Sequence, residues 1–240
     1  MTSMIKHRRK AKATLFQKTR MDEGNILTSK TRFDIVEAYK IARTNIIYSI
    51  IEKGAKTIAI SSALPSEGKT TTCINLAITF AETGAKVLLI DGDLRSPRVH
   101  RYLKLSQRPG LSNILGGFAL FREAVQKTSY ENLDALVCGH IPPNSAELLA
   151  SKKMDALLNT LKSEYDYIFL DSPPINIVTD VAILSKMISG VVIVIRHAQT
   201  TFEDVYDALE KFKLVHTKVL GFILNDARGE EKHPYYKTGR

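Results

Sequence analysis

Five apolar, β-branched runs recur along the chain and are separated by segments in which apolar residues have helical spacing. The runs lie at 57–61, 87–90, 167–170, 191–195 and 219–224. Their apolar positions are continuous rather than alternating, as in strands that are buried on both faces. Such strands joined by helices predict an α/β fold with a doubly wound, mostly parallel sheet. In folds of this class, ligands bind beyond the carboxyl ends of the strands.

Two further segments complete the pattern. From residue 34 onward, apolar side chains recur every three or four residues and predict a helix packed on the fold, through Ile35, Tyr39, Ala42, Ile46 and Ile50. Residues 109–151 contain Gly and Pro clusters around one short apolar stretch at 133–138. We expect loops, short helices and an edge strand there.

The net charge of +9 is concentrated at the N-terminus. Seven basic residues and no acidic one precede Asp22: Lys6, Arg8, Arg9, Lys10, Lys12, Lys18 and Arg20. We therefore divide the chain into a basic flexible arm (1–32), one folded domain (33–227) and a mobile polar tail (228–240). The arm suits anionic lipid headgroups, nucleic acid or an acidic partner, and a merely solvated arm explains its charge equally well.

The cysteine content and the hydropathy of the chain indicate in which cellular compartment the protein is expected. Cys73 and Cys138 are too few for a disulfide framework, and we expect both in the core, with no structural metal site. No apolar run approaches the ~20 residues that cross a bilayer. The basic start lacks the following apolar region of a signal peptide. A cytoplasmic location is therefore expected.

The strongest chemical signal is the segment 58–75, IAISSALPSEGKTTTCIN, in which an apolar run breaks into a loop and then becomes helical. The consensus GxxxxGK[ST] binds nucleotide phosphates through backbone N–H groups and a lysine, and its hydroxyl binds Mg²⁺. Here Ala63 stands at the first Gly. A Ser- and Gly-rich turn that only caps a helix is the alternative. The strand before the loop and the helix after it favour phosphate binding, by Ser66, Glu67, Gly68, Lys69, Thr70 and Thr71.

Acidic residues follow two other runs at their carboxyl ends. VLLIDGDLR contains Asp91 and Asp93, and YIFLDSPP contains Asp171, which has the placing of a Walker-B aspartate. One such Asp alone could equally be a turn former or a helix cap. Because these strand ends converge on one sheet edge, we predict that Thr70, Asp91 and Asp171 hold Mg²⁺ with bound ATP.

Catalysis is assigned to Lys69, Asp91 and Asp93. Lys69 is expected to neutralise phosphate charge in a loose transition state. Asp93 need not share the metal of Asp91 and is the candidate base. A tyrosine hydroxyl has a pKa of ~10, so a carboxylate that accepts its proton as the bond forms would assist transfer. Arg95 could pair with a phosphate or with one of these aspartates, and the sequence leaves both open.

Together these motifs resemble those of the bacterial tyrosine kinases of capsule and exopolysaccharide synthesis, the BY-kinases. ALPSEGKT, LLIDGDLR and IFLDSPP are similar to the family's variant Walker A, A′ and B motifs, and the resemblance covers about residues 33–227. RSPRVH, GLSNILGG and PPNSAELLAS also look like family sequence. The resemblance implies a P-loop NTPase fold. It also implies an ATP- and Mg²⁺-dependent protein-tyrosine kinase that autophosphorylates in trans and regulates polysaccharide synthesis and export.

The resemblance also assigns residues outside the three motifs. Asn225 matches the position that contacts adenine in related P-loop proteins, although a turn former would also be placed there. Glu37, Lys40 and Arg43 correspond to the family's ExxRxxR motif for ring assembly, with Lys replacing one Arg. A homo-oligomer, either a ring or a dimer, is implied. A solvated helix face with i,i+3 charges explains the same three residues.

The family's C-terminal tyrosine cluster is reduced here to Tyr235 and Tyr236, the implied phosphoacceptors. A stretch of nine residues reaches about 30 Å, enough for an adjacent subunit's site. Family members of this length resemble the cytoplasmic, kinase-only half of a split system. The implied partners are a transmembrane adaptor of the polysaccharide co-polymerase type and protein substrates, at the inner face of the plasma membrane. Nucleic acid is not an expected partner.

Other P-loop families share this architecture. Partition and septum-positioning ATPases have a signature lysine early in the Walker A loop, where this chain has Leu64. Nitrogenase-type reductases need cluster-binding cysteines that Cys73 and Cys138 do not match. An ATPase switch, or an ATP-binding assembly factor without kinase activity, is the alternative function.

Overall fold

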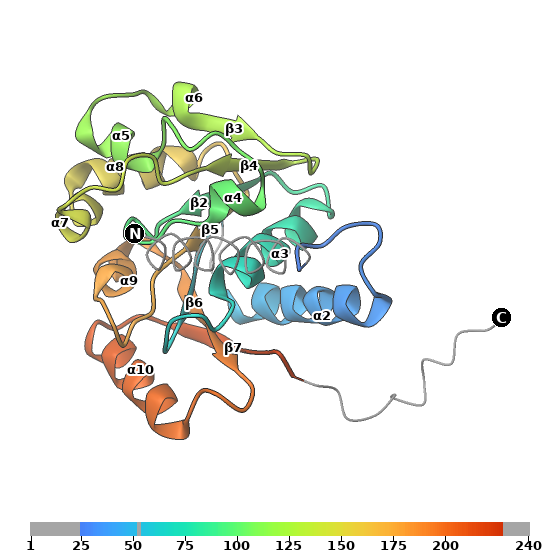
Figure 1. The fold of residues 1–240 in the computed structure, drawn as a ribbon. Helices are drawn as coiled ribbons and strands as arrows, with labels where there is room; N and C mark the ends of the chain where they lie inside the picture. The colour runs from blue at the N-terminus through green and yellow to red at the C-terminus, as the bar shows by residue number, and fades with distance from the viewer. Residues whose placement is uncertain (1–24, 52–53, 228–240) are drawn as a thin grey trace, which may run out of the picture.

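The computed structural model describes residues 25–51 and 54–227, which form a seven-stranded sheet between two layers of helices (Figure 1). Each strand is parallel to its neighbours except β3, which is antiparallel to β4. In spatial order the strands are β3 (Val125–Lys127), β4 (Leu133–Leu136), β2 (Val87–Asp91), β5 (Tyr167–Asp171), β1 (Lys56–Ser62), β6 (Gly190–Arg196) and β7 (Val219–Asn225). The predicted doubly wound, mostly parallel sheet is confirmed.

Two apolar clusters, one on each face of the sheet, form the core. One face packs against α2 (Phe33–Ser49), α3 (Lys69–Ala81) and the short α4 (Val99–Tyr102). The other face is covered by α5 (Leu111–Gly116), α6 (Phe121–Ala124), α7 (Ser145–Leu149), α8 (Lys152–Leu161), α9 (Asp180–Ile183), η1 (Leu184–Met187) and α10 (Phe202–Leu214). Successive residues of β2 alternate between the two clusters, with Leu88 on one face and Leu89 on the other. A strand buried on both faces has no polar side to alternate with, which explains the continuous apolar runs.

All five predicted strands are present, each within about one residue of its predicted bounds. The edge strand β7 differs in burial, because its side chains alternate between half-buried and exposed along its second half. Phe222 and Leu224 are 45% and 52% exposed. The prediction that this run is buried on both faces is therefore wrong, since a strand at the sheet edge has fewer neighbours to cover it.

The segment 109–151 contains short helices, as predicted, but its strand differs from the prediction. The apolar stretch forms β4, which lies inside the sheet between β2 and β3. The edge strand is β3. Its three residues show no apolar periodicity from which the strand could have been predicted. A strand this short depends on the antiparallel hydrogen bonds that β4 offers it.

The predicted N-terminal helix is α2, whose packed face includes Ile46, and the buried Ile50 follows directly after its last residue. Ile35, which the spacing placed on that face, is 42% exposed. The first turn of α2 therefore packs less closely on the apolar cluster than the later turns do.

The folded part begins earlier than the predicted boundary at residue 33. Ile26 and Leu27 are buried in the cluster beneath α2 and α3. The backbone N–H of Leu27 donates to Oδ1 of Asn75 at 2.9 Å, and Nδ2 of Asn75 donates to the carbonyl of Asn25 at 2.9 Å. Residues 25–32 thus belong to the domain rather than to the arm. The rest of the predicted arm and the tail 228–240, with Tyr235 and Tyr236, lie outside the described residues.

Both cysteines are buried and unpaired, as predicted. Within the described residues, the longest apolar helical stretch is too short or too polar to span a bilayer.

Candidate functional site

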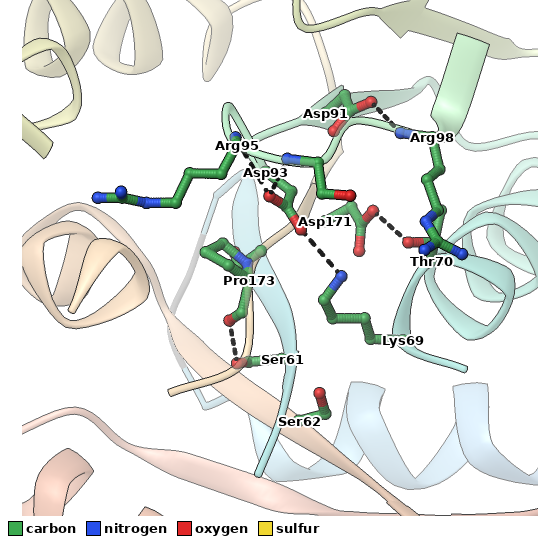
Figure 2. A network of polar contacts seen from close by, with 12 residues as sticks. Ser61, Ser62, Lys69, Thr70, Asp91, Asp93, Arg95, Arg98, Asp171 and Pro173 are labelled. Atoms are coloured by element: carbon green, nitrogen blue, oxygen red, sulfur yellow. Dashed lines mark hydrogen bonds and ion pairs between the residues drawn. The ribbon is translucent and has the colours of Figure 1, made fainter. Parts of the chain in front are cut away.

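Three adjacent strands end at the centre of the sheet edge, and their ends form the floor of the candidate site. Asp91 at the end of β2 pairs in register with Asp171 at the end of β5, and Asp171 pairs with Ile60 of β1. The chain then passes from β1 through the phosphate-binding loop into α3. Figure 2 shows Lys69, Thr70, Asp93 and Asp171 pointing toward one another from these elements. The predicted convergence of strand ends therefore exists.

The loop depends on Gly68. This residue has a φ of +90°, in the left-handed region that L side chains rarely adopt, and it ends the loop at the first turn of α3. A Cβ at this position would lie 2.1 Å from Nδ2 of Asn225. The same Nδ2 atom donates to the carbonyl of Glu67 at 2.9 Å. Asn225 thus supports the loop from the end of β7.

Glu67 stabilises the loop through its side chain. The carboxylate is fully buried and accepts a hydrogen bond from the N–H of Leu64 at 2.8 Å through Oε2. Its other oxygen accepts a short hydrogen bond from the hydroxyl of Thr200. Glu67 was predicted among the nucleotide-binding residues. Its side chain lines neither of the cavities described next and instead bridges the two ends of the loop.

Two cavities meet at the loop. One of about 290 Å³ is lined by Lys69, Thr70, Asp93 and the start of the segment after β5. The other, of about 600 Å³, lies between α2 and the end of β7 and includes Asn225. Both cavities are lined by Ser66, Gly68, Thr71 and Arg196. The loop therefore has one cavity beside the acidic residues and another beside Asn225, at opposite ends of one continuous surface.

Lys69 and Asp93 form an ion pair in the first cavity. Nζ of Lys69 lies 3.1 Å from Oδ2 of Asp93, and the two side chains are 12% and 5% exposed. The other oxygen of Asp93 accepts from the N–H groups of Arg95 at 3.3 Å and Ser96 at 2.9 Å. Burial by itself would lower the pKa of Lys69, but the carboxylates of Asp171, Asp93 and Asp91 outweigh it and raise the pKa. Lys69 is therefore a firmly charged cation.

Asp91 and Asp171 are fully buried, and each has one oxygen without a hydrogen-bond partner among the described residues. Oδ2 of Asp171 accepts from the hydroxyl of Thr70 at 2.7 Å. Oδ2 of Asp91 accepts from the N–H groups of Arg98 and Val99, both at 3.1 Å. Burial raises the pKa of both carboxyls, and Lys69 opposes that rise at Asp171, whose pKa is about 6.

These groups fit a Mg²⁺ ion that is partly coordinated by a substrate. Across residues 25–51 and 54–227, no cluster of three or more His, Cys, Asp or Glu side chains could hold a metal alone. Mg²⁺ commonly takes one or two carboxylates and completes its shell with phosphates and water. Asp171 meets that requirement, because its Oδ1 is unpartnered and its Oδ2 contacts the hydroxyl of Thr70. Asp91, which pairs with Asp171 in register, also has one unpartnered oxygen. Thr70, Asp91 and Asp171 thus come together as predicted, and their metal role stays a prediction.

Arg95 pairs with an aspartate that the sequence did not single out. Its guanidinium makes two bonds to Asp180, at 2.9 and 3.0 Å, and Asp180 is almost completely buried. This arrangement ties the loop after β2 to the start of α9. Neither Asp91, Asp93 nor Asp171 is the partner of its side chain.

The predicted oligomerisation residues lie on α2, away from the phosphate-binding loop. Lys40 pairs with Glu37 at 2.8 Å, one helical turn apart. Arg43 donates through Nη1 to the carbonyl of Thr79 in α3 at 2.5 Å. All three are half-buried, and their role between subunits stays a prediction.

Arg98 was not identified individually from the sequence, although it lies within RSPRVH. It precedes α4 and lines the first cavity with Lys69 and Thr70. Its position became visible only in three dimensions, because the backbone between Asp91 and α4 folds back over the strand end.

Comparison with known proteins adds identity to this geometry. Residues 55–224 match the family model described as AAA domain. The tyrosine-protein kinase YwqD of Bacillus subtilis (strain 168) is 39% identical over 222 residues, which cover 92% of this chain and 94% of that protein. This chain belongs to the bacterial tyrosine kinases. Its enzyme class is therefore that of protein-tyrosine kinases, as the three motifs indicated.

Solved structures agree with this assignment. The kinase domain of the Escherichia coli tyrosine kinase ETK has a TM-score of 0.78 and 29% identity, with 86% of this chain and 80% of that domain covered. The septum site-determining protein MinD of Pyrococcus horikoshii OT3, solved with Mg-ADP, has a TM-score of 0.63 and 26% identity, covering 73% and 72%. The bacterial tyrosine kinases thus share their architecture with septum-positioning ATPases, as the sequence suggested.

Proposed function

We propose that this kinase transfers the γ-phosphoryl group of Mg²⁺-bound ATP to tyrosines of its own tail, between subunits, and to other proteins. By doing so it regulates the synthesis and export of a capsular or extracellular polysaccharide. The main support is the meeting of Lys69, Thr70, Asp93 and Asp171 in one cavity at the phosphate-binding loop. A phosphoryl-transfer site needs a phosphate cation, metal ligands and a proton acceptor within reach of one another.

The nucleotide lies along the loop, with its base toward Asn225 and its phosphates toward Lys69. The cavity beside Asn225 supports the base position, because the two cavities meet at Ser66, Gly68 and Thr71. The N–H groups at the start of α3 and the lysine ammonium face the phosphates. Thr70, Asp91 and Asp171 would hold Mg²⁺. The bound ion supplies positive charge that neutralises the phosphate oxygens.

Lys69 exchanges partners when phosphate arrives. Its ammonium is paired with Oδ2 of Asp93 in the structure. Phosphate oxygens compete for that ammonium and release this carboxylate oxygen. The N–H groups of Arg95 and Ser96 keep the other oxygen of Asp93 in place. Asp93 thus becomes a free base only when a nucleotide is present, which limits proton abstraction to the loaded enzyme.

The acceptor tyrosine packs against the segment after β5. Pro173, Pro174, Ile177 and Val178 of this segment line the cavity and offer an apolar surface against which an aromatic ring can pack. A hydroxyl placed there is near Asp93, which takes its proton as the new oxygen–phosphorus bond forms and the bond to ADP breaks.

The remaining elements of the proposal concern assembly. Asn225 at the end of β7 contacts the phosphate-binding loop, and the sequence 228–240 that follows contains Tyr235 and Tyr236. Phosphorylation in trans requires a ring or a dimer, for which we propose Glu37, Lys40 and Arg43. A transmembrane adaptor of the polysaccharide co-polymerase type places the kinase at the inner face of the plasma membrane. The basic arm contributes to that docking.

A mixing experiment tests the core of this proposal. Lys69→Met removes the phosphate cation but keeps both tail tyrosines, whereas a Tyr235→Phe/Tyr236→Phe variant keeps the active site but lacks acceptors. With labelled ATP, Mg²⁺ and an adaptor fragment, neither protein alone should label its tail, and the mixture should label Tyr235 or Tyr236 of the Lys69→Met chain. Phosphotyrosine mapping by mass spectrometry identifies the acceptor. Absence of any phosphotyrosine in the wild-type protein, with ATP binding intact, would remove the claim of kinase activity.

A further inference from the structure

Arg98 lines the catalytic cavity, yet the mechanism above gives it no role. It is the residue before the first turn of α4, and its side chain borders the same cavity as Lys69, Thr70 and Asp93. Figure 2 shows the side chain running from the loop after Asp91 toward the side of Thr70, where the metal and phosphate groups are expected. Its location therefore differs from that of Arg95, which extends away from the phosphate-binding loop in the same view.

The backbone of Arg98 is fixed by the site itself. Its N–H and that of Val99 both donate to Oδ2 of Asp91, at 3.1 Å each. Asp91 is fully buried at the end of β2, so it anchors the start of α4 directly to the floor of the cavity. Because the backbone of Arg98 is anchored, its side chain can reach only a limited region. This favours a defined contact of the guanidinium in the cavity over free movement in solvent.

The guanidinium of Arg98 has no hydrogen bond or ion pair within residues 25–51 and 54–227. Its neighbour Arg95 provides the contrast, because both of its bonds from the guanidinium go to Asp180. Lys69 is likewise occupied by Asp93. Arg98 is half-buried at a cavity wall, where its five N–H donors face a space that must accept a highly charged phosphate.

We propose that Arg98 binds the transferred γ-phosphoryl group and stabilises its transition state. In that state negative charge is spread over the equatorial phosphoryl oxygens while the bond to the β-phosphate breaks and the bond to the tyrosine oxygen forms. The tyrosine proton passes to Asp93, ADP is released, and the guanidinium neither gains nor loses a proton. This inference rests on the proposed function and adds a second cation, supplied by the same chain, to Lys69.

An arginine suits this position better than a second lysine would. The planar fork can donate two parallel hydrogen bonds to phosphate oxygens, whereas an ammonium acts as a point charge. Arginines that reach the transferred phosphate in other nucleotide-hydrolysing enzymes accelerate transfer by about 10³ to 10⁵. Because Lys69 and Mg²⁺ share the neutralisation here, we expect the loss of Arg98 to lower kcat by about 10² to 10³.

A binding experiment tests the contact without any phosphoryl transfer. The dissociation constants of Mg-ADP and of a non-hydrolysable Mg-ATP analogue are compared for the wild type and Arg98→Ala. The affinity for ADP should stay within about twofold, and that for the analogue should fall about tenfold, because only the analogue has a γ-phosphate. Arg101→Ala, an exposed arginine of α4, is the matched control and should change neither constant. Equal losses for both nucleotides, or no loss for either, would contradict the proposal.

Steady-state kinetics with a tyrosine peptide and Mg-ATP then test the catalytic role. Arg98→Ala should lower kcat without raising the KM of the peptide, and Arg98→Lys should recover part of the rate. Unchanged kcat with a raised KM for acidic peptides would assign Arg98 to the acceptor instead and overturn the proposal. If the wild type forms no phosphotyrosine while Arg98→Ala still loses affinity for the analogue, the proposed function fails and the γ-phosphate contact stands.

Discussion

Buried carboxylates occur on both sides of the phosphate-binding loop, but the two sides treat them in opposite ways. Behind the loop, both oxygens of Glu67 accept hydrogen bonds, from Leu64 and Thr200. At the strand ends, Asp91 and Asp171 are equally buried, yet each has an oxygen with no partner among the described residues. A satisfied buried carboxylate fixes a shape, whereas an unsatisfied one destabilises the protein until a ligand arrives.

At one sheet edge, some buried polar residues stabilise the phosphate-binding loop and others are free to bind a ligand. The loop must hold its N–H groups in place before a nucleotide binds, so Glu67 and Asn225 bridge it to neighbouring segments. In the proposed function the two aspartates bind Mg²⁺, and hydrogen bonds to every carboxylate oxygen would compete with that ion. Burial raises the pKa of Asp171 to about 6, because the charged carboxylate is less stable in the protein interior than in water.

The largest expected effect comes from neutralising the unsatisfied side. Asp171→Asn should reduce phosphorylation by at least about 10³-fold, because the proposed mechanism makes Asp171 a ligand of Mg²⁺. The same change should stabilise the nucleotide-free protein. A pKa of about 6, compared with ~3.9 in an unfolded chain, corresponds to roughly 3 kcal/mol at neutral pH, and this net value already includes the attraction of Asp171 to Lys69. We expect the melting temperature to rise by roughly 6–12 °C in thermal unfolding. A lower melting temperature would show that the charged carboxylate of Asp171 does not destabilise the folded protein.

The opposite result is expected on the satisfied side. Glu67→Ala removes the acceptor for the N–H of Leu64 and the hydroxyl of Thr200, so we expect a loss of roughly 1–3 kcal/mol in the free energy of unfolding. Denaturant titration measures this change, and ADP affinity should fall as well because the loop is no longer preorganised. Thr200→Ala, which removes one of the two donors, is the matched control with a smaller loss. A Glu67→Ala protein as stable as the wild type would show that the two hydrogen bonds of Glu67 do not stabilise the fold, contrary to this prediction.

A smaller effect is expected from pH and sharpens the same comparison. The folded-state pKa of Asp171 lies above the unfolded value, so the folded protein binds more protons than the unfolded chain between about pH 4 and pH 6. Its contribution to stability is present below pH 4 and is lost as the pH rises through 6. The stability difference between Asp171→Asn and the wild type should therefore shrink as the pH falls from 7 to 4. Denaturant titrations at several pH values measure it, and a difference that grows on acidification would contradict the stated direction.

How far the sequence predicts the structure depends on how local each feature is. Continuous apolar runs located β1, β2, β5 and β6, since a strand buried on both faces must be apolar throughout. An apolar run also located β7, although this edge strand is half-exposed. The brief edge strand β3 has no such run and exists because β4 offers it hydrogen bonds. The docking of Ile26 and Leu27 was likewise hidden, because their partner Asn75 lies far away in the chain.

The sequence by itself determined the fold class, the phosphate-binding loop and the aspartates at the strand ends. Each of these depends on residue types at fixed spacing, and parallel strands bring their carboxyl ends to one edge whatever the details of packing. Only the tertiary structure decided that Arg95 pairs with Asp180, that Glu67 braces the loop and that Arg98 faces the cavity. Those roles depend on which side chains meet across long sequence separations, and no periodicity in the chain records such meetings.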